Sequence, residues 1–532
     1  MGTLQLGAWR GPRRARRGPR LLTLLLAWCG CAVGATEVPT VSGPVPVTAA
    51  TRPYGAAVVP GAPESMDLES AGYVEAEFFV SGHASAYAYD PAFNLISQRE
   101  RIAYTTRILV RRPRNARRFS GVVVLESAHP LMGGHGGWLA AQRYLLSHGD
   151  AYVVVMTGDD ALTRGAALAP ERAALVQRTR AAGAALGVIE AMRLVDPARY
   201  APIVWPDDDA PRWDAIAQVA ALLKANLPGG PMGGLRVRRI YAQGWSFTGS
   251  LLRTFINEGF HDRARDASGR PLIDGYLVGI SAAPFISGMV PLTTGAPVLP
   301  VGHPRRTTRA IDVPVIELMT ENEAITNLGP QATDADRGIG RHRIYEVPGL
   351  THGDGLAAPG ESSTMRYQLQ QAGFHAAQSS GCTLEASDVP MRDLASAALA
   401  NLELWVTRGT PAPASLRLDM ADGGNRPRRD SLGNALGGVR VAQVEVPLAH
   451  YTVPGPDASE ACRNEPSPFL KIRRQPLADT ELADRYRDAD EYLRRFRSQV
   501  NGLVRQRLLL PEDGRREIQD AQRRATAAFG GR

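Results

Sequence analysis

A serine in a tight turn is the first feature of this sequence that suggests chemistry. The run Gly-Trp-Ser-Phe-Thr at 244–248 stands between a β-forming run at 237–242 and a helical pattern at 248–258. A sharp strand-to-helix turn exposes a serine hydroxyl, and it needs small residues two before and two after the serine. Thr248 stands where the common Gly-x-Ser-x-Gly pattern has its second glycine. The context predicts that Ser246 is a nucleophile, and the alternative is an ordinary strand–helix turn.

A serine nucleophile in such a turn works with an acid and a histidine that come later in the chain, in that order. Both residue types follow Ser246 in this order. A strand-like run at 313–319 ends in Thr-Glu-Asn-Glu, which offers Glu321 and Glu323. We assign the acid to Glu323 because its spacing from the strand suits the role, and we keep Glu321 as the alternative. The next strand-like run, at 342–347, leads into a glycine-containing turn that holds His352. An imidazole titrates near neutral pH, so His352 can take the serine proton and later return it.

When a serine attacks a carbonyl carbon, the carbonyl oxygen becomes an oxyanion. This oxyanion needs two backbone N–H donors. The residue after the nucleophile, Phe247, is expected to supply one of them. The other is expected from the loop after the β-forming run at 121–125, where Ala128 and His129 are the candidates. The glycine-rich run at 133–137 lacks the Gly-Lys-Ser/Thr ending of a nucleotide loop, so we interpret it as a flexible rim of an acyl pocket.

Strand-like and helical patterns alternate in the part of the chain that would position these residues. This alternation predicts a mostly parallel central sheet flanked by helices. The β-forming runs are 73–80, 105–110, 121–125, 152–156, 237–242, 272–280, 313–319 and 342–347, and the helical patterns are 138–147, 213–227, 248–258 and 395–406.

The chain divides into a main domain and several flanking segments. Residues 36–65 are expected to form an extended lead-in, and residues 66–406 the main domain. The stretches 158–211 and 281–310 break the alternation, and we interpret them as candidate lid insertions. Residues 407–532 are expected to form a C-terminal extension packed on the main domain, with helical, charged patterns near 482–509.

The first 35 residues have the layout of a secretory signal. Six arginines precede a short apolar run, and small residues around Ala35 mark a cleavage site. The alternative is an uncleaved anchor helix. Removal of this leader would lower the formal net charge from +8 to near +2 and leave Cys382 and Cys462 as the remaining cysteines. Export to the periplasm or the medium would favour a disulfide between them, the alternative being two unrelated thiols.

Other ligand classes find little support in the sequence. No clustered basic face suggests nucleic acid, and no internal run is long enough to span a membrane. The pairs and runs of aspartate at 159–160 and 207–209 lack the twelve-residue calcium-loop pattern, so we expect solvated acidic loops there. We predict no metal and no cofactor, and the oligomeric state stays open.

Several motifs together resemble those of the α/β-hydrolase-domain family of large, mostly secreted bacterial proteins with largely unassigned substrates. Phe247 departs from the family's usual glutamine after the nucleophile, and Glu323 from its more common aspartate. The motifs that carry the resemblance are Gly72–Gly82 for the opening strand, Ser246–Gly249 and Leu252–Phe255 for the nucleophile turn and helix, Thr320–Glu323 and Gly349–His352 for the acid and histidine turns, and Asp430–Arg440 for a late motif.

This resemblance implies an α/β-hydrolase fold and ester hydrolysis. The sequence therefore predicts a serine hydrolase that cleaves a small carboxylic ester through an acyl-enzyme on Ser246. An amidase or peptidase would use the same residues, and a binding protein that keeps the fold without catalysis is the alternative from another class.

Overall fold

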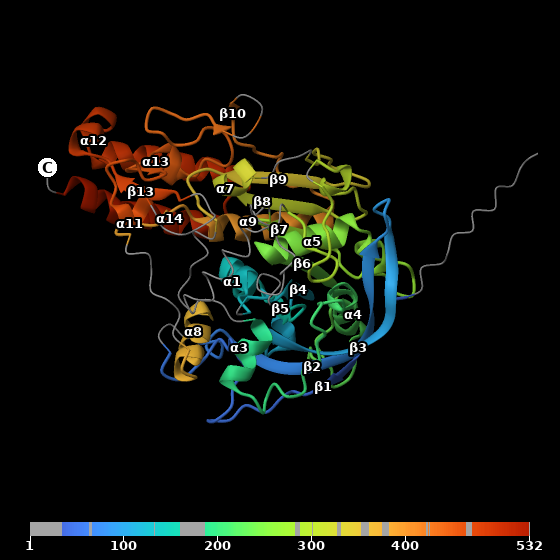
Figure 1. Cartoon of the computed structure of the whole chain (residues 1–532). Helices are drawn as coiled ribbons and strands as arrows, with labels where there is room; N and C mark the ends of the chain where they lie inside the picture. Colours follow the sequence, from blue (N-terminus) through green and yellow to red (C-terminus); the bar gives the residue numbers. More distant parts are fainter. Residues whose placement is uncertain are drawn as a thin grey trace, which may run out of the picture. The chain divides into compact units, whose positions relative to one another are not determined.

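A computed structural model gives the structure of the chain (Figure 1). The predicted secretory signal lies outside the described residues apart from Ala35, and so do the middle of the first candidate lid and part of the second. The residues that the structure describes are 35–62, 66–131, 133–159, 187–281, 288–300, 302–326, 331–352, 361–374, 382–421, 424, 426–463 and 471–530.

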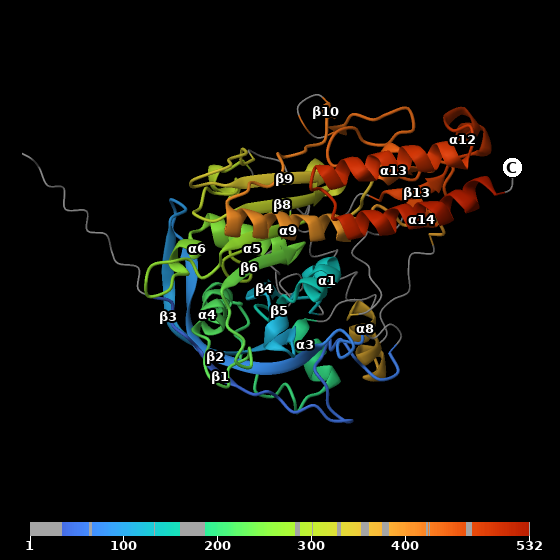
Figure 2. The same cartoon turned by 180° about the vertical axis from the view of Figure 1, so that it is seen from behind.

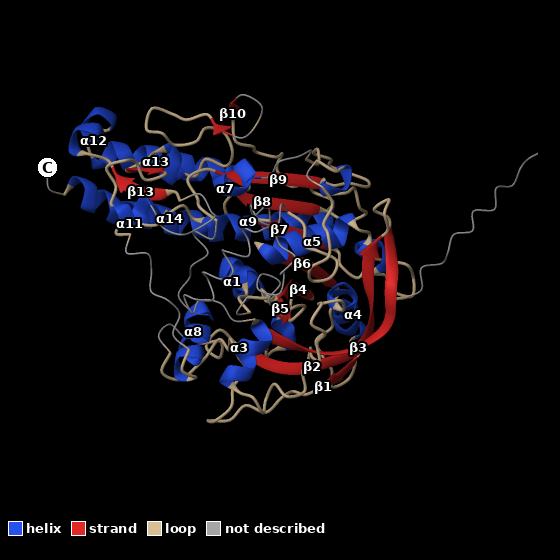
Figure 3. Cartoon of the chain, in the orientation of Figure 1, coloured by secondary structure: helices blue, strands red, loops and turns tan. Residues whose placement is uncertain are grey.

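A nine-stranded sheet forms the centre of the fold, in the order β1-β2-β3-β5-β4-β6-β7-β8-β9. The pairs β1–β2, β2–β3 and β3–β5 are antiparallel, whereas the pairs among β4 to β9 are parallel. Figure 3 shows these strands in red. This confirms the predicted mostly parallel sheet. The strands are β1 (Thr40–Ser42), β2 (Tyr73–Tyr89), β3 (Leu95–Pro113), β4 (Val122–Ser127), β5 (Ala151–Val155), β6 (Arg239–Trp245), β7 (Gly275–Gly279), β8 (Val315–Thr320) and β9 (His342–Val347).

Successive side chains of the sheet enter two different hydrophobic cores. In β4, Val122 and Val124 join the core with α1 (Gly136–His148) and α9 (Met391–Arg408). Val123 and Leu125 join the core with α4 (Arg212–Ala225) and α5 (Phe247–Asn257). Because side chains of a strand alternate between faces, helices must cover both faces of the sheet, as Figures 1 and 2 show. The parallel strands are therefore buried on both sides, which explains their nearly continuous apolar sequences.

The antiparallel part of the sheet is longer than the sequence pattern predicts. The expected strands at 73–80 and 105–110 are β2 and β3, which pair from Tyr73 with Pro113 to Tyr89 with Leu95. The first half of β3 is largely exposed, so it lacks the hydrophobic alternation by which a strand is recognised.

The region after residue 407 packs on the core that contains α1 and α9. Tyr492, Phe496 and Val500 of α13 (Ala489–Arg505) are buried in that core. A second long helix, α14 (Pro511–Phe529), lies beside α13 and was absent from the sequence prediction (Figures 1 and 2). Its sequence is strongly charged, and its small buried positions, Ala521 and Ala525, give a weak apolar pattern.

The remaining elements are short or connect these layers. They are η1 (Ala116–Arg118), α3 (Val188–Val195), α6 (Phe260–Arg263), η2 (Pro304–Arg306), α7 (Glu321–Thr326), α8 (Glu361–Gln371), β10 (Met420–Ala421), β11 (Arg426–Pro427), α10 (Ala442–Glu445), β12 (Ala449–Thr452), α11 (Glu460–Arg463), β13 (Arg473–Pro476) and α12 (Asp479–Arg485). Within the described ranges, no helix combines the length and the apolarity that crossing a bilayer requires.

The expectation of solvated acidic loops is wrong for Asp209 and Asp159, both of which are buried. The Asp209 carboxylate accepts hydrogen bonds from the Asp159 amide at 2.9 Å and the Trp205 indole at 2.8 Å, and it forms an ion pair with Arg212. A buried charge is tolerated when it is paired and hydrogen-bonded in this way.

Cys382 and Cys462 form a disulfide, with 4.4 Å between their Cα atoms. This confirms the pairing and excludes two separate thiols. The bond joins residues 80 positions apart in the chain and ties the segment before α9 to α11.

We predict that the double variant Cys382→Ala/Cys462→Ala loses about 2–5 kcal/mol of unfolding free energy, because the crosslink restricts the unfolded chain. Urea unfolding of both proteins, with and without a phosphine reductant, measures the change. The reductant should destabilise the wild type and leave the variant unchanged. Equal midpoints for the two proteins without reductant would contradict the prediction.

Candidate active site

Ser246 occupies a strained backbone position between β6 and α5, with φ 58° and ψ −120°. Such a conformation costs about 1–3 kcal/mol for a residue with a side chain. It persists here because the chain around it is tightly packed. A Cβ on Gly244 would lie 2.3 Å from the Thr248 carbonyl oxygen, and one on Gly249 would lie 2.5 Å from the Gly279 carbonyl oxygen. Glycine is therefore required on both sides of the turn.

Thr248 takes part in the turn through its hydroxyl. Its Oγ1 accepts the Trp245 N–H at 2.8 Å and donates to the Trp245 carbonyl at 2.9 Å. A second glycine at position 248 would usually allow a close backbone contact. Here Gly249, one residue later, makes that close contact. The sequence pattern includes Gly249 but does not reveal this close approach, because the carbonyl oxygen belongs to a neighbouring strand.

The structure brings Ser246, His352 and Glu323 together from three separate segments that each follow a strand. The distance from Ser246 Oγ to His352 Nε2 is 2.7 Å, and that from His352 Nδ1 to Glu323 Oε1 is 2.6 Å. The three residues follow β6, β9 and β8, whose carboxyl ends meet at one edge of the sheet. With Nδ1–H donating to the carboxylate, Nε2 can accept the serine proton, which is the geometry of a nucleophile and its general base.

The Glu323 carboxylate is fully buried and well supported. The Thr320 amide donates to its Oε2 at 3.1 Å, with a second bond from the Thr320 hydroxyl, and Asn322 Nδ2 donates to its Oε1 at 2.8 Å. Burial acts to raise the pKa of Glu323, but the charge of His352 and these hydrogen bonds outweigh it and hold the pKa below its usual value. The group is therefore an anion at neutral pH.

Glu321, the alternative acid, faces other partners. Its Oε2 accepts the Gly349 N–H at 2.9 Å, and its Oε1 is 2.7 Å from the Arg429 guanidinium. Gly349 lies in the turn that leads to His352, so Glu321 links this turn to the C-terminal region.

A second link from the C-terminal region reaches the residue next to the histidine. The Thr351 hydroxyl accepts the Ile472 N–H at 2.6 Å and lies 3.3 Å from the Ile472 carbonyl oxygen. The histidine turn is thus held from one side by Arg429, acting through Glu321, and from another by Ile472.

The expected second oxyanion donors are already engaged. The Ala128 N–H donates to the Val155 carbonyl at 2.8 Å, and the His129 N–H donates to the Gly134 carbonyl at 2.9 Å. Neither amide is free to bind an oxyanion, so the assignment of this role to the backbone of Ala128 or His129 is wrong for this conformation. Phe247 opens α5, where the first N–H groups have no carbonyl partner within the helix.

A buried carboxylate supports the loop that carries His129. Both oxygens of Glu126 accept the Gly137 N–H, at 2.8 and 2.9 Å, and Tyr152 donates its hydroxyl to Oε2 at 2.6 Å. Burial raises the pKa of Glu126 to about 7. This role was not predictable from the sequence, because the partners of Glu126 come from another strand and from a helix.

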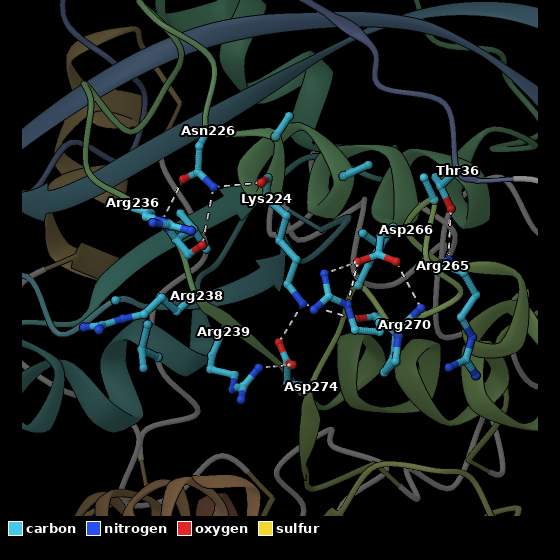
Figure 4. Close-up of a pocket in the computed structure, with 18 of the residues that line it drawn as sticks. Thr36, Lys224, Asn226, Arg236, Arg238, Arg239, Arg265, Asp266, Arg270 and Asp274 are labelled. Carbon is cyan, nitrogen blue, oxygen red and sulfur yellow. Dashed lines mark hydrogen bonds and ion pairs between the residues drawn. The ribbon is translucent and has the colours of Figure 1, made fainter.

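A cavity of about 990 Å³ lies away from these residues, at the amino ends of β4, β6 and β7 (Figure 4). Parallel strands carry Ser246 and His352 at their opposite ends, so this cavity is not part of the site. It gathers six basic side chains, which are Lys224, Arg236, Arg238, Arg239, Arg265 and Arg270. Asp274 pairs with Lys224 at 2.8 Å and with Arg239 at 3.3 Å. No group of three or more possible metal ligands occurs in the part of the chain that the structure describes.

Comparison with known proteins gives one extensive match. The family model described as alpha/beta hydrolase domain matches residues 41–519. No curated protein was found to match the chain.

Similar solved structures share little sequence with this chain. Est1E from Butyrivibrio proteoclasticus is 11% identical, with a TM-score of 0.25 over 55% of this chain and 99% of its own. Dienelactone hydrolase from Anabaena variabilis ATCC 29413 is 9% identical, with a TM-score of 0.22 over 55% of this chain and 96% of its own. Because the family model spans nearly the whole sequence, the chain belongs to the alpha/beta hydrolase domain family.

Proposed function

We propose that this protein is a serine hydrolase that cleaves a carboxylic ester through an acyl-enzyme on Ser246. The hydrogen-bonded chain from Ser246 through His352 to Glu323 carries the proposal. Membership of a hydrolase family supports hydrolysis as the reaction class. The choice of an ester over an amide rests on the resemblance of the sequence motifs to those of the family, which implies ester hydrolysis.

The residues would act in two half-reactions. Ser246 Oγ attacks the ester carbonyl carbon while its proton passes to His352 Nε2, and the carbonyl oxygen becomes the oxyanion. Collapse of this intermediate breaks the bond to the alcohol oxygen, which takes the proton from His352. Water then attacks the acyl-enzyme with the same proton transfers, releasing the acid and restoring the serine. The Glu323 anion stabilises the imidazolium in both halves.

We also propose that the protein is exported after cleavage near Ala35. The Cys382–Cys462 disulfide supports this, because such bonds persist in oxidising compartments. Expression of the full chain in a bacterial host, followed by amino-terminal sequencing of the periplasmic fraction, should find Thr36 or a near neighbour as the first residue. A full-length chain that stays in the membrane fraction would instead favour the uncleaved anchor.

A fluorophosphonate probe should label the purified protein at Ser246, because it traps a serine that has an adjacent base. The variant Ser246→Ala should take no label and should lose about 10⁴–10⁶-fold in turnover of a chromogenic ester. Peptide mapping by mass spectrometry identifies the labelled residue.

Ser250, one helical turn beyond, provides the matched control. Its hydroxyl donates to the Ser281 carbonyl and is fully buried, so Ser250→Ala should still take the label at Ser246. Absence of label in folded wild-type protein would favour the non-catalytic binding protein.

A kinetic comparison of Glu323→Gln and Glu321→Gln should distinguish the roles of the two carboxylates. Glu323→Gln removes the charge that stabilises the imidazolium, and kcat should fall by about 10²–10⁴-fold. Glu321→Gln keeps a carbonyl oxygen for the Gly349 amide, so kcat should fall less than about 10-fold, while loss of the Arg429 ion pair lowers the melting temperature by a few degrees. Steady-state rates and thermal unfolding measure both effects. Equal losses of kcat in the two variants would contradict the assignment.

A further inference from the structure

The site described so far lacks one oxyanion donor. The Phe247 N–H can supply one, but a tetrahedral intermediate is commonly held by two. The amides of Ala128 and His129, which follow β4, are both committed to carbonyl oxygens. Among the described residues, we therefore look for the second donor in another group near the nucleophile.

The His129 imidazole is such a group, and its tautomer is set by the backbone. The Leu131 N–H donates to His129 Nδ1 at 3.1 Å, so Nδ1 is the acceptor and the proton of the neutral ring lies on Nε2. None of the residues that the structure describes accepts a hydrogen bond from this Nε2–H. This N–H is therefore held in a fixed direction and has no acceptor within the described part of the chain.

The ring stays neutral over the working range of pH. Burial, with a contribution from the charge of His352, lowers the pKa of His129 to about 4. His129 therefore does not compete with His352 for the serine proton, and it keeps one N–H to donate.

The position of His129 suits the reaction. Its ring lies edge-on to the ring of Phe247, the residue after the nucleophile, with 5.9 Å between the centroids. The turn that carries it is fixed by backbone bonds of 2.9 Å in which the Gly133 amide donates to the His129 carbonyl and the Val188 amide donates to the Pro130 carbonyl. A donor that is fixed before the reaction needs no reorganisation in the transition state.

We propose that the His129 Nε2–H is the second oxyanion donor and acts together with the Phe247 amide. When Ser246 Oγ bonds to the carbonyl carbon and its proton passes to His352, the electron pair of the C=O bond moves to the oxygen. The His129 N–H stabilises that charge by a hydrogen bond and keeps its own proton throughout. This role makes His129 a catalytic residue, and it rests on the ester hydrolysis proposed above.

Two amide variants separate this role from a packing role. The Nδ2 and Oδ1 atoms of Asn overlay the Nδ1 position of histidine, so His129→Asn keeps an acceptor for the Leu131 amide but has no donor at the Nε2 position. Gln reaches that position, so His129→Gln can restore the donor while losing the acceptor. A packing role predicts that Asn is the better substitute, whereas the catalytic role predicts that Gln is.

The variants should be compared with p-nitrophenyl acetate as substrate and phenylboronic acid as an analogue of the tetrahedral intermediate. For His129→Asn we expect kcat to fall by about 10²–10³-fold with little change in KM, and the boronate inhibition constant to rise with the loss of kcat. His129→Gln should keep kcat within about 10-fold of the wild type.

The outcomes distinguish this inference from the proposed function. Wild-type activity in His129→Asn, or equal losses in the two variants with or without a fall in melting temperature, would overturn the role of His129 alone. Wild-type protein that takes neither fluorophosphonate label nor ester would overturn the proposed function and this inference together.

Discussion

The backbone of Ser246 is held at a positive φ of 58°, and the arrangement around it depends on that strain being retained. The Ser246 amide donates to the Gly279 carbonyl at 3.0 Å, and its carbonyl accepts the Ser250 amide at 3.0 Å. The turn is thus tied to β7 on one side and to α5 on the other. These bonds and the close packing at Gly244 and Gly249 offset the cost of the conformation, and the hydroxyl is left at the carboxyl edge of the sheet.

The C-terminal region is part of what holds the histidine turn. Arg429 reaches that turn through Glu321, and Ile472 reaches it through Thr351. The late motif that begins at Asp430 directly follows Arg429, and the Asp430 carboxylate accepts the amides of Leu432 and Asn434 at 3.0 Å. The motif therefore has a structural role, because it shapes the loop from which Arg429 reaches Glu321.

Sequence patterns predicted the parts that depend on local order along the chain. Buried parallel strands are apolar throughout, and Ser246, Glu323 and His352 each follow one of them, so their meeting at one edge of the sheet could be predicted from their order along the chain. The engagement of the His129 amide was not predictable, because its partner is a carbonyl in a turn whose shape the sequence does not reveal. The exposed half of β3 and the helix α14 escaped recognition for a related reason, since neither carries a clear apolar period.

Glu321 and Glu323 are only two residues apart but contact different groups, because both lie in helix α7. Residues i and i+2 of an α-helix point in different directions, so Glu321 and Glu323 of α7 cannot serve the same partner. Glu323 faces the His352 ring, and Glu321 faces the backbone of the turn that carries the ring. One carboxylate thus sets the charge beside the imidazole while the other sets where the imidazole lies. In extended backbone the side chains of residues i and i+2 point to the same face, so Glu321 and Glu323 would then face the same way. The short helix after β8 therefore allows the two carboxylates to reach different partners.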